Sequence, residues 1–300
     1  MQQNLKTGLI GLGAMGTPIA ANLAAAGMLH RAWNRNHDKA AAFANTWNTT
    51  LAASPAELAR HCELILTCVS DSPDLLQVVT QLVPAMQQGK IVIDLSTTSV
   101  EAARQAAQLL QAAGGDFLDA PVSGGIEGAR QATLVMMIGG CPTVFKQALP
   151  VLKVISKKQL HMGPTGSGQA AKAVNQVMAA GINQAVTESL AFGQALGLDM
   201  NNLIEAISAG AASSWFVQHR GQSLLAGHYD KGFKLSLHQK DLAICQQLAS
   251  SLTQGDKKLP LVEMTRIHYQ KLIESGHGDK DISCLYLLKR ELFGLPQEQR

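Results

Sequence analysis

The stretch that decides the fold is TGLIGLGAMG, residues 7–16. It begins as a short apolar run of strand length, and the amphipathic helical pattern TPIAANLAAAG follows it. Gly11, Gly13 and Gly16 form a GxGxxG turn between the two, which lets a pyrophosphate approach the N-terminus of the helix. A strand, this turn and a helix in that order predict a dinucleotide-binding site. The predicted cofactor-binding residues of this turn are Gly11, Leu12, Gly13, Ala14, Met15 and Gly16.

The second apolar run, HRAWNRN, ends in residues that bear on the choice of cofactor. NAD-binding sites usually carry Asp or Glu about 20 residues beyond the glycines, where it accepts a hydrogen bond from the ribose. This chain has Asn34 and Arg35 there, and a guanidinium pairs with a 2′-phosphate whereas a carboxylate repels it. We therefore expect NADP(H) to be preferred, with NAD(H) possible; the alternative is that Arg35 is only a surface arginine.

Further strand-like runs alternate with Ala-rich helical patterns through the first half of the chain. They are ELILTCVS, KIVIDLS, DFLDAPVS and TLVMMIGG. This alternation predicts a Rossmann-type α/β domain with a doubly wound parallel sheet. Ligands bind at the carboxyl ends of such strands, so we expect loops 68–71, 95–99 and 120–125 to line the cleft, with Val69 and Ser70 at the cofactor.

The chain changes character after Pro164. No strand-like run follows, and residues 168–196 are free of proline and could form one helix about 40 Å long at ~1.5 Å per residue. Helical patterns also occur at 200–209, 237–252, 260–275 and 281–293. We predict a nucleotide-binding domain over 1–164. An all-helical domain for substrate binding and oligomerisation is predicted over 165–300, beginning with the long interdomain helix.

Composition narrows the class of protein. The 300 residues are 46% hydrophobic and 16% charged with a formal net charge of +3, and no basic run marks a nucleic-acid binder. No apolar run reaches the ~18 residues of a membrane span, so we expect a cytoplasmic protein with no membrane partner. Five cysteines without a CxxC pair are expected to be buried free thiols, and no metal site is expected.

The segment GSGQAAKAVNQ, residues 166–176, holds one charge, Lys172, in an otherwise uncharged stretch. On a helix Gln169, Lys172, Asn175 and Gln176 share one face. A lysine in an uncharged wall loses solvation, which should lower its pKa and make its proton transferable to a substrate oxygen. The alternative is a lysine at the edge of a core helix that extends its ammonium to water.

These motifs together resemble the β-hydroxyacid dehydrogenase family, over nearly the whole chain. The motifs are GLIGLGAMG, FLDAPVSGGIEGARQATL, GSGQAAKAVNQ and FKLSLHQKDLAI. The resemblance implies a catalytic segment with Lys172 as general acid/base and Asn175 beside it. It also implies that Ser123, Gly124 and Gly125 hold the substrate carboxylate, that Thr97 lies at the nicotinamide, and that Lys240 approaches the cofactor with Asp241 supporting it.

Two further positions complete the predicted site. Gln176 and Trp215 are assigned to substrate binding, although Trp215 could instead fill the helical core. The chain departs from the family at Ala132, where relatives commonly have glycine, and in its CVSD loop. The predicted activity is an NADP(H)-preferring reductase, reversible as a dehydrogenase, for a small β-hydroxy acid and its semialdehyde.

The alternatives are an imine reductase on the same scaffold and a non-catalytic cofactor-binding scaffold protein. Imine reductases typically lack the lysine at position 172, which disfavours that alternative. A homodimer or homotetramer is expected, because a long apolar helix needs neighbours on several sides. The sequence leaves open which of the hydroxyisobutyrate, tartronate semialdehyde, succinate semialdehyde or glyoxylate types is the substrate.

Overall fold

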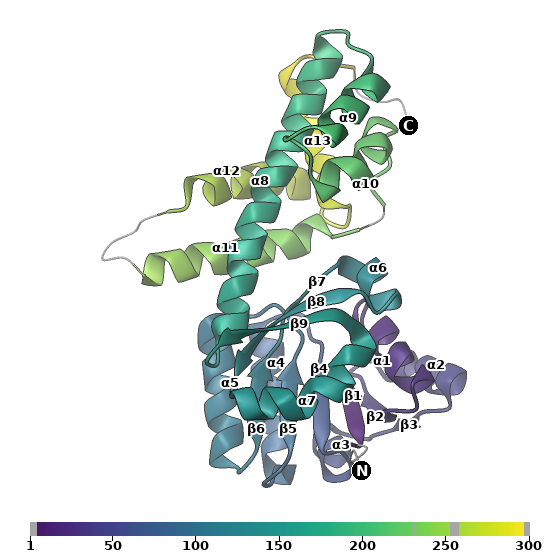
Figure 1. The fold of residues 1–300 in the computed structure, drawn as a ribbon, viewed down its shortest axis with the longest axis vertical. Coiled ribbons are helices and arrows are strands. Elements are labelled where there is room, and N and C mark those ends of the chain that lie inside the picture. Colours follow the sequence, from purple (N-terminus) through teal and green to yellow (C-terminus); the bar gives the residue numbers. More distant parts are fainter. Residues whose placement is uncertain (1–4, 231, 253–257, 297–300) are drawn as a thin grey trace. The chain divides into compact units, whose positions relative to one another are not determined.

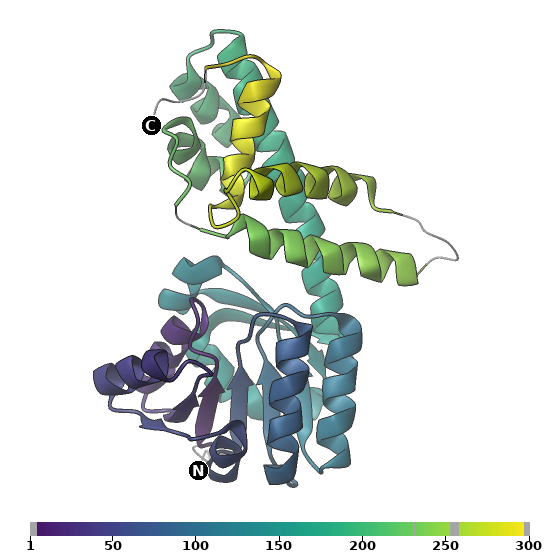
Figure 2. The ribbon, with the colours of Figure 1, turned by 180° about the vertical axis from the view of Figure 1, so that it is seen from behind.

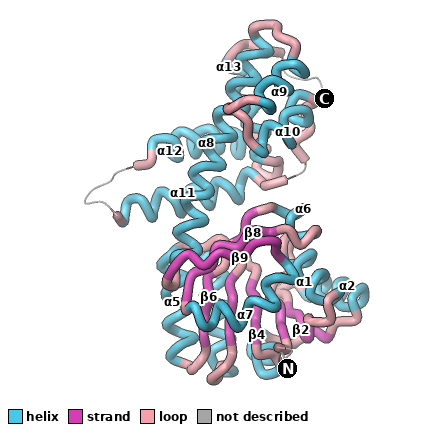
Figure 3. The backbone as a smooth tube through the Cα atoms, in the orientation of Figure 1, coloured by secondary structure: helices cyan, strands magenta, loops and turns pink. Residues whose placement is uncertain are grey.

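The computed structural model describes residues 5–230, 232–252 and 258–296. The chain divides into two compact units, Met1–Lys172 and Ala173–Arg300 (Figure 1). In the described part of the chain the named strands all belong to the first unit, and the second is helical apart from one isolated bridge between Lys234 and Asp281 (Figure 3). The predicted fold class, an α/β domain followed by helices, is confirmed. The predicted domain ranges stay a prediction.

The first unit is built on one nine-stranded sheet in the order β3-β2-β1-β4-β5-β6-β8-β7, with β9 paired to β8. The first six positions have the strand order typical of dinucleotide-binding sheets, with a switch point between β1 and β4. The strands are β1 Thr7–Ile10, β2 Leu29–Trp33, β3 Thr50–Leu51, β4 Leu64–Thr67, β5 Ile91–Asp94, β6 Asp116–Asp119, β7 Val122–Ser123, β8 Leu134–Gly140 and β9 Ser156–Gly163.

The expectation that all strands run parallel is wrong at one edge. β8 pairs antiparallel with both β6 and β7, while β9 pairs parallel with β8. β6 and β7 pair with β8 in one continuous register, from Leu118 opposite Gly140 to Ser123 opposite Val135, so the chain keeps its direction across Ala120 and Pro121. The chain reverses between Ser123 and Leu134, since an antiparallel partner needs no long crossover, and the segment from Ser123 to Gly125 lies where this reversal begins.

Helices cover both faces of the sheet (Figures 1 and 2). One apolar core joins β-strand residues to α1, α2 and α7, and a separate core packs α3, α4 and α5 on the opposite face. Asp71 caps α4 and Ser99 caps α5, so the loops after β4 and β5 also start the helices that follow. The helices are α1 Gly16–Ala25, α2 His37–Trp47, α3 Pro55–His61, α4 Ser72–Leu82, η1 Val83–Ala85, α5 Val100–Ala112, α6 Gly125–Arg130 and α7 Pro142–Ile155.

The second unit is organised around α8, Ser167–Ala195, which begins in the first unit and continues into the second. Its bounds lie within one residue of the predicted helix. A single apolar core joins it to the helices that follow, which are α9 Met200–Ala209, α10 Trp215–Leu225, α11 Leu235–Ser251, α12 Pro260–Glu274, η2 Ile282–Cys284 and α13 Leu285–Leu292. Among the described residues no helix has the length and hydropathy of a membrane span.

Candidate active site

The glycine-rich turn after β1 has the geometry that a bound pyrophosphate requires. Gly11 has a φ of +101°, and a Cβ there would lie 2.1 Å from the carbonyl oxygen of Cys68. A Cβ on Gly16 would lie 1.8 Å from the carbonyl oxygen of Gly11, whereas Gly13 faces open space. Only glycine fits at the first and third positions, and the second leaves the backbone accessible. This turn fits a dinucleotide cofactor.

A cavity of about 390 Å³ lies at the carboxyl ends of β1, β2 and β4. Of the predicted cofactor-binding residues, it is lined by Gly11, Leu12, Gly13, Asn34, Arg35, Val69 and Ser70. Ala14, Met15, Gly16 and Thr97 do not line it; the first three lie in the turn and at the start of α1, and Thr97 lies half-buried in the loop after β5. The cavity has room for the adenosine end of a nucleotide beside the turn.

Asn34 and Arg35 are both already engaged within the first unit. Asn34 Oδ1 accepts a hydrogen bond of 2.8 Å from the backbone N–H of Leu12, which ties the end of β2 to the glycine turn. Arg35 Nη1 forms an ion pair of 2.9 Å with Asp74 Oδ1, and the arginine side chain is 73% exposed. Asp74, which is not among the site residues predicted from the sequence, also lines the cavity.

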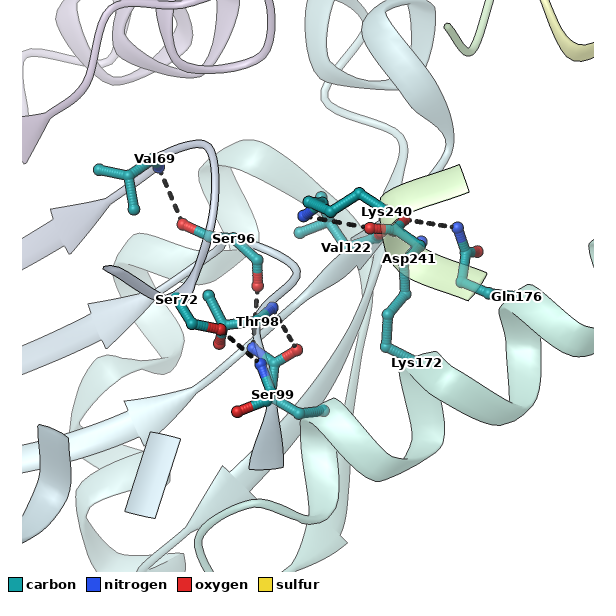
Figure 4. A network of polar contacts seen from close by, with 11 residues as sticks. Val69, Ser72, Ser96, Thr98, Ser99, Val122, Lys172, Gln176, Lys240 and Asp241 are labelled. Carbon is teal, nitrogen blue, oxygen red and sulfur yellow. Dashed lines mark hydrogen bonds and ion pairs between the residues drawn. The ribbon is translucent and has the colours of Figure 1, made fainter. Parts of the chain in front are cut away.

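The loops after β4 and β5 are joined through Ser96. Its Oγ accepts a hydrogen bond of 2.8 Å from Val69 N–H and donates one of 2.6 Å to Asp94 Oδ1, and Figure 4 shows Ser96 below Val69. Burial raises the pKa of Asp94 to about 6. Burial also raises the pKa of the Cys68 thiol to about 12, so that this cavity-lining cysteine is no thiolate nucleophile.

The predicted carboxylate-binding segment forms β7 and the start of α6. Gly124 has a φ of +131° and Gly125 one of +63°, so the backbone bends in a way that other residues rarely adopt. Lys172 Nζ donates a hydrogen bond of 3.0 Å to the carbonyl oxygen of Val122, the residue immediately before Ser123. The structure of the first unit therefore brings Lys172 to the segment that begins at Ser123 (Figure 4).

In the second unit, four predicted residues form one chain of polar contacts. Asn175 Nδ2 donates to Gln176 Oε1 at 3.0 Å, and Gln176 Nε2 donates to Asp241 Oδ2 at 2.8 Å. Asp241 Oδ1 forms an ion pair of 3.1 Å with Lys240, as Figure 4 shows. Lys240 and Asp241 both lie within α11, which begins at Leu235, two residues before the helical pattern at 237–252.

Trp215 does not fill the helical core. It is 61% exposed at the start of α10, stacks on His219 at 4.4 Å between ring centroids, and has the Arg220 guanidinium 5.5 Å from its ring. None of the five cysteines forms a disulfide; three are buried as expected, whereas Cys68 is half-buried and Cys141 is exposed. Within the described ranges no group of three or more His, Cys, Asp or Glu side chains is placed to hold a metal ion.

Two buried carboxylates were missed by the sequence analysis. Asp94 ends β5 after three buried apolar residues, and Asp119 ends β6 after two. Asp119 accepts hydrogen bonds from the backbone N–H groups of Gly166 and Gln169. Burial raises its pKa, and those backbone hydrogen bonds oppose the rise. A carboxylate that closes an apolar strand was the signal that could have identified both.

Comparison with known proteins covers both units. Residues 6–163 match the family model described as the NAD binding domain of 6-phosphogluconate dehydrogenase. Residues 166–288 match the model described as the NAD-binding domain of NADP-dependent 3-hydroxyisobutyrate dehydrogenase.

Individual relatives are similar along most of their length. The chain is 35% identical to 2-hydroxy-3-oxopropionate reductase of Escherichia coli, over 83% of this chain and 85% of that protein. It is 31% identical to the mitochondrial 3-hydroxyisobutyrate dehydrogenase of Drosophila melanogaster, over 96% and 90%. A solved structure of Mycobacterium tuberculosis 3-hydroxyisobutyrate dehydrogenase with L-serine has a TM-score of 0.86 and 28% identity, covering 95% of this chain and 99% of that one.

Proposed function

Because the chain belongs to the β-hydroxyacid dehydrogenase family of NAD(P)-dependent oxidoreductases, we propose that it interconverts a small β-hydroxy acid and the corresponding semialdehyde, with NADP(H) as the preferred cofactor. The observation that carries this proposal is the hydrogen bond from Lys172 Nζ to Val122, beside Ser123. It puts a proton donor next to a backbone segment suited to a carboxylate.

The substrate class follows from the chemistry of that segment. Ser123 and the two glycines after it offer a hydroxyl and backbone N–H groups at a sharp bend, which suits a carboxylate. L-serine, present in the related Mycobacterium tuberculosis structure, carries both a carboxylate and a hydroxyl on its β-carbon. A carboxylated aldehyde with its carbonyl one carbon farther from the carboxylate than an α-keto acid is the matching oxidised form.

A bound nicotinamide cofactor supplies the hydride in the reductive direction and accepts it in the oxidative one. In reduction, Lys172 donates a proton to the carbonyl oxygen as the carbonyl carbon is reduced, which gives the hydroxyl group. In oxidation the neutral lysine accepts the hydroxyl proton. Asn175, three residues along α8, is proposed to bind the same oxygen, and Gln176 and Trp215 remain predicted substrate contacts.

The preference for NADP(H) is supported by the charges around the cavity. Arg35 and Lys39 both line it, and Asp74 contributes one opposing charge. One cation shortly after β2 and another in the first turn of α2 favour a 2′-phosphate over a free hydroxyl. The proposal also allows use of NAD(H), because Arg35 forms an ion pair with Asp74 and is largely exposed, which weakens its attraction for a 2′-phosphate.

The experiment that tests the function is an absorbance assay at a wavelength specific to the reduced cofactor, with NADPH and then NADH. The panel contains tartronate, methylmalonate and succinate semialdehydes and glyoxylate, each with its uncarboxylated aldehyde as the matched control. Oxidation of NADPH by tartronate or methylmalonate semialdehyde but not by its control supports the proposal, and the rates with glyoxylate and succinate semialdehyde measure how strictly the spacing between carbonyl and carboxylate is required. No turnover with any acid, together with tight binding of NADPH, would refute it and favour an imine substrate or a non-catalytic role.

A further inference from the structure

The start of α8 is held by one buried side chain. Asp119 Oδ1 accepts a hydrogen bond of 2.8 Å from Gly166 N–H, and Asp119 Oδ2 accepts one of 2.9 Å from Gln169 N–H. The first N–H groups of a helix have no partner within the helix itself. A carboxylate at this end also meets the positive end of the helix dipole. Asp119 therefore caps α8 from another element, β6.

The surroundings of Asp119 are shaped to fit a carboxylate of this length. A Cβ on Gly139 would lie 2.5 Å from Asp119 Oδ1, and a Cβ on Gly168 would lie 2.8 Å from Asp119 Oδ2. Any side chain at either glycine would displace the carboxylate or the helix. The extra methylene of a glutamate has no room in the same place.

Gln169 attaches the same turn of α8 to the loop after β5. Its Oε1 accepts a hydrogen bond of 3.0 Å from Thr98 N–H, and its Nε2 donates one of 2.9 Å to the carbonyl oxygen of Ser96. Lys172 lies three residues farther along, a rise of about 4.5 Å, on the same side of the helix. Both attachments lie in the turn directly before the lysine.

We propose that Asp119 is a positioning residue for Lys172. By holding the N–H groups of Gly166 and Gln169, it fixes where α8 starts and how the helix is rotated, and so places the Lys172 ammonium at Val122. This inference rests on the acid/base role proposed for Lys172. Asp119 touches neither substrate nor reacting atoms in this role.

The test is a double-mutant cycle between Asp119→Asn and Lys172→Ala. Asparagine has the size of aspartate but only one side-chain oxygen. Its amide NH₂ group would face the second backbone N–H and could not accept a hydrogen bond from it. With Lys172 present, we expect kcat to fall about 10- to 100-fold, because a misplacement of about 1 Å can cost that much. The dissociation constant of NADPH, measured by fluorescence titration, should stay within about twofold.

In the Lys172→Ala protein, Asp119→Asn should change the residual rate less than about threefold, since no lysine is left to misplace. If that residual rate is too low, methylamine added to both alanine proteins restores a proton donor, and the two rescued rates should agree. If Asp119→Asn slows the reaction equally in both backgrounds, Asp119 is only structural and the inference is overturned.

Asp281→Asn is the matched control. Asp281 is also buried and accepts two backbone hydrogen bonds, from Phe233 and Ser283, at the start of η2. Its loss should have the same effect with and without Lys172. If Asp119→Asn does not fold, Asp119→Ser keeps one acceptor and replaces it in the cycle.

A measurement on the cofactor-free protein gives an independent result. Hydrogen–deuterium exchange of the peptide covering 164–172 should be faster in Asp119→Asn than in the wild type, and unchanged in Asp281→Asn. Unchanged exchange in Asp119→Asn would overturn the inference. If Lys172→Ala alone retains the wild-type rate, the proposed acid/base role fails instead, and the two failures are distinguishable.

Discussion

Asp94 and Asp119 are register partners in the parallel pairing of β5 with β6, and both side chains are fully buried. Asp94 Oδ1 accepts hydrogen bonds from Thr67 and Ser96, while Oδ2 has no hydrogen-bond partner among the described residues. Burial raises the pKa of Asp94, and the negative charge of Asp119 adds to the rise. Two adjacent strands thus end in carboxylates with different tasks, one joined to the loops and one to α8.

The raised pKa of Asp94 predicts a pH-dependent stability. Its native pKa is about 6, above the roughly 3.9 of an unfolded aspartate, so the native state binds more protons between these values. The stabilisation that this carboxyl group contributes is therefore lost as the pH rises from about 4 to about 6. Above that range its contribution to the free energy of unfolding no longer changes with pH. The unfolding free energy of Asp94→Asn, relative to the wild type, should rise by about 2–3 kcal/mol between pH 4 and pH 7. Urea titrations at fixed ionic strength measure it; a difference that does not vary with pH contradicts the prediction.

Removal of the lysine should abolish most turnover without loss of the cofactor. Lys172→Ala is expected to lower kcat about 10²- to 10⁴-fold, the usual contribution of a positioned proton donor. NADPH binding and thermal stability should change little, and added methylamine should restore part of the rate. Lys157→Ala, which removes an exposed lysine of β9, is the control and should keep full activity. Near-normal turnover of the Lys172→Ala protein would remove the acid/base role.

The pair of Arg35 and Asp74 predicts opposite effects on cofactor choice. Arg35→Ala should weaken NADPH binding about 10- to 100-fold, the value of a charged hydrogen bond to phosphate, and leave NADH nearly unchanged. Asp74→Asn should strengthen NADPH binding a few-fold, about 2- to 5-fold after screening by solvent, because it frees Arg35 and removes a like charge. Titrations with both cofactors measure these values, and an unchanged NADPH-to-NADH ratio in Arg35→Ala would contradict the assignment.

Ala132 carries a backbone conformation that favours glycine. Its φ is +55°, in the left-handed region, two residues before β8. Ala132→Gly should therefore raise the unfolding free energy by about 0.5–1 kcal/mol, since a left-handed alanine costs about 1–2 kcal/mol and glycine loses more chain entropy. Ala41→Gly, within α2, should lower stability by a similar amount, about 0.5–1 kcal/mol. If Ala132→Gly lowers the unfolding free energy as Ala41→Gly does, the backbone of Ala132 is not strained.

The sequence predicts those strands and helices in which the local pattern of apolar residues matches the burial that the structure shows. The glycine turn, the apolar strands β1, β4 and β5, and α8 follow directly from runs that are buried or free of proline. β9 was missed because most of its residues are exposed and polar, and only pairing with β8 makes it a strand. α10 was missed because it holds a glycine and several weak helix formers, and is stabilised by packing of Val217 and Leu224.

The residues of the candidate site also fall into two groups, those that a local pattern predicts and those that it does not. Residues whose role depends on the local backbone, such as Gly11 and Gly16, were predicted because their spacing alone carries the information. Asp119 was missed because its partners, Gly166 and Gln169, lie 47 and 50 residues away in the sequence. The same is true of Asp74, which meets Arg35 from another element, 39 residues on. Side chains that act through distant partners leave little periodic signal.

The continuity of α8 fixes the spacing between two of the predicted site residues. The boundary between the compact units falls between Lys172 and Ala173, inside a helix that is unbroken from Ser167 to Ala195. Lys172 and Asn175 therefore belong to one continuous helix, and their backbones stay about 4.5 Å apart along its axis for as long as that helix is intact.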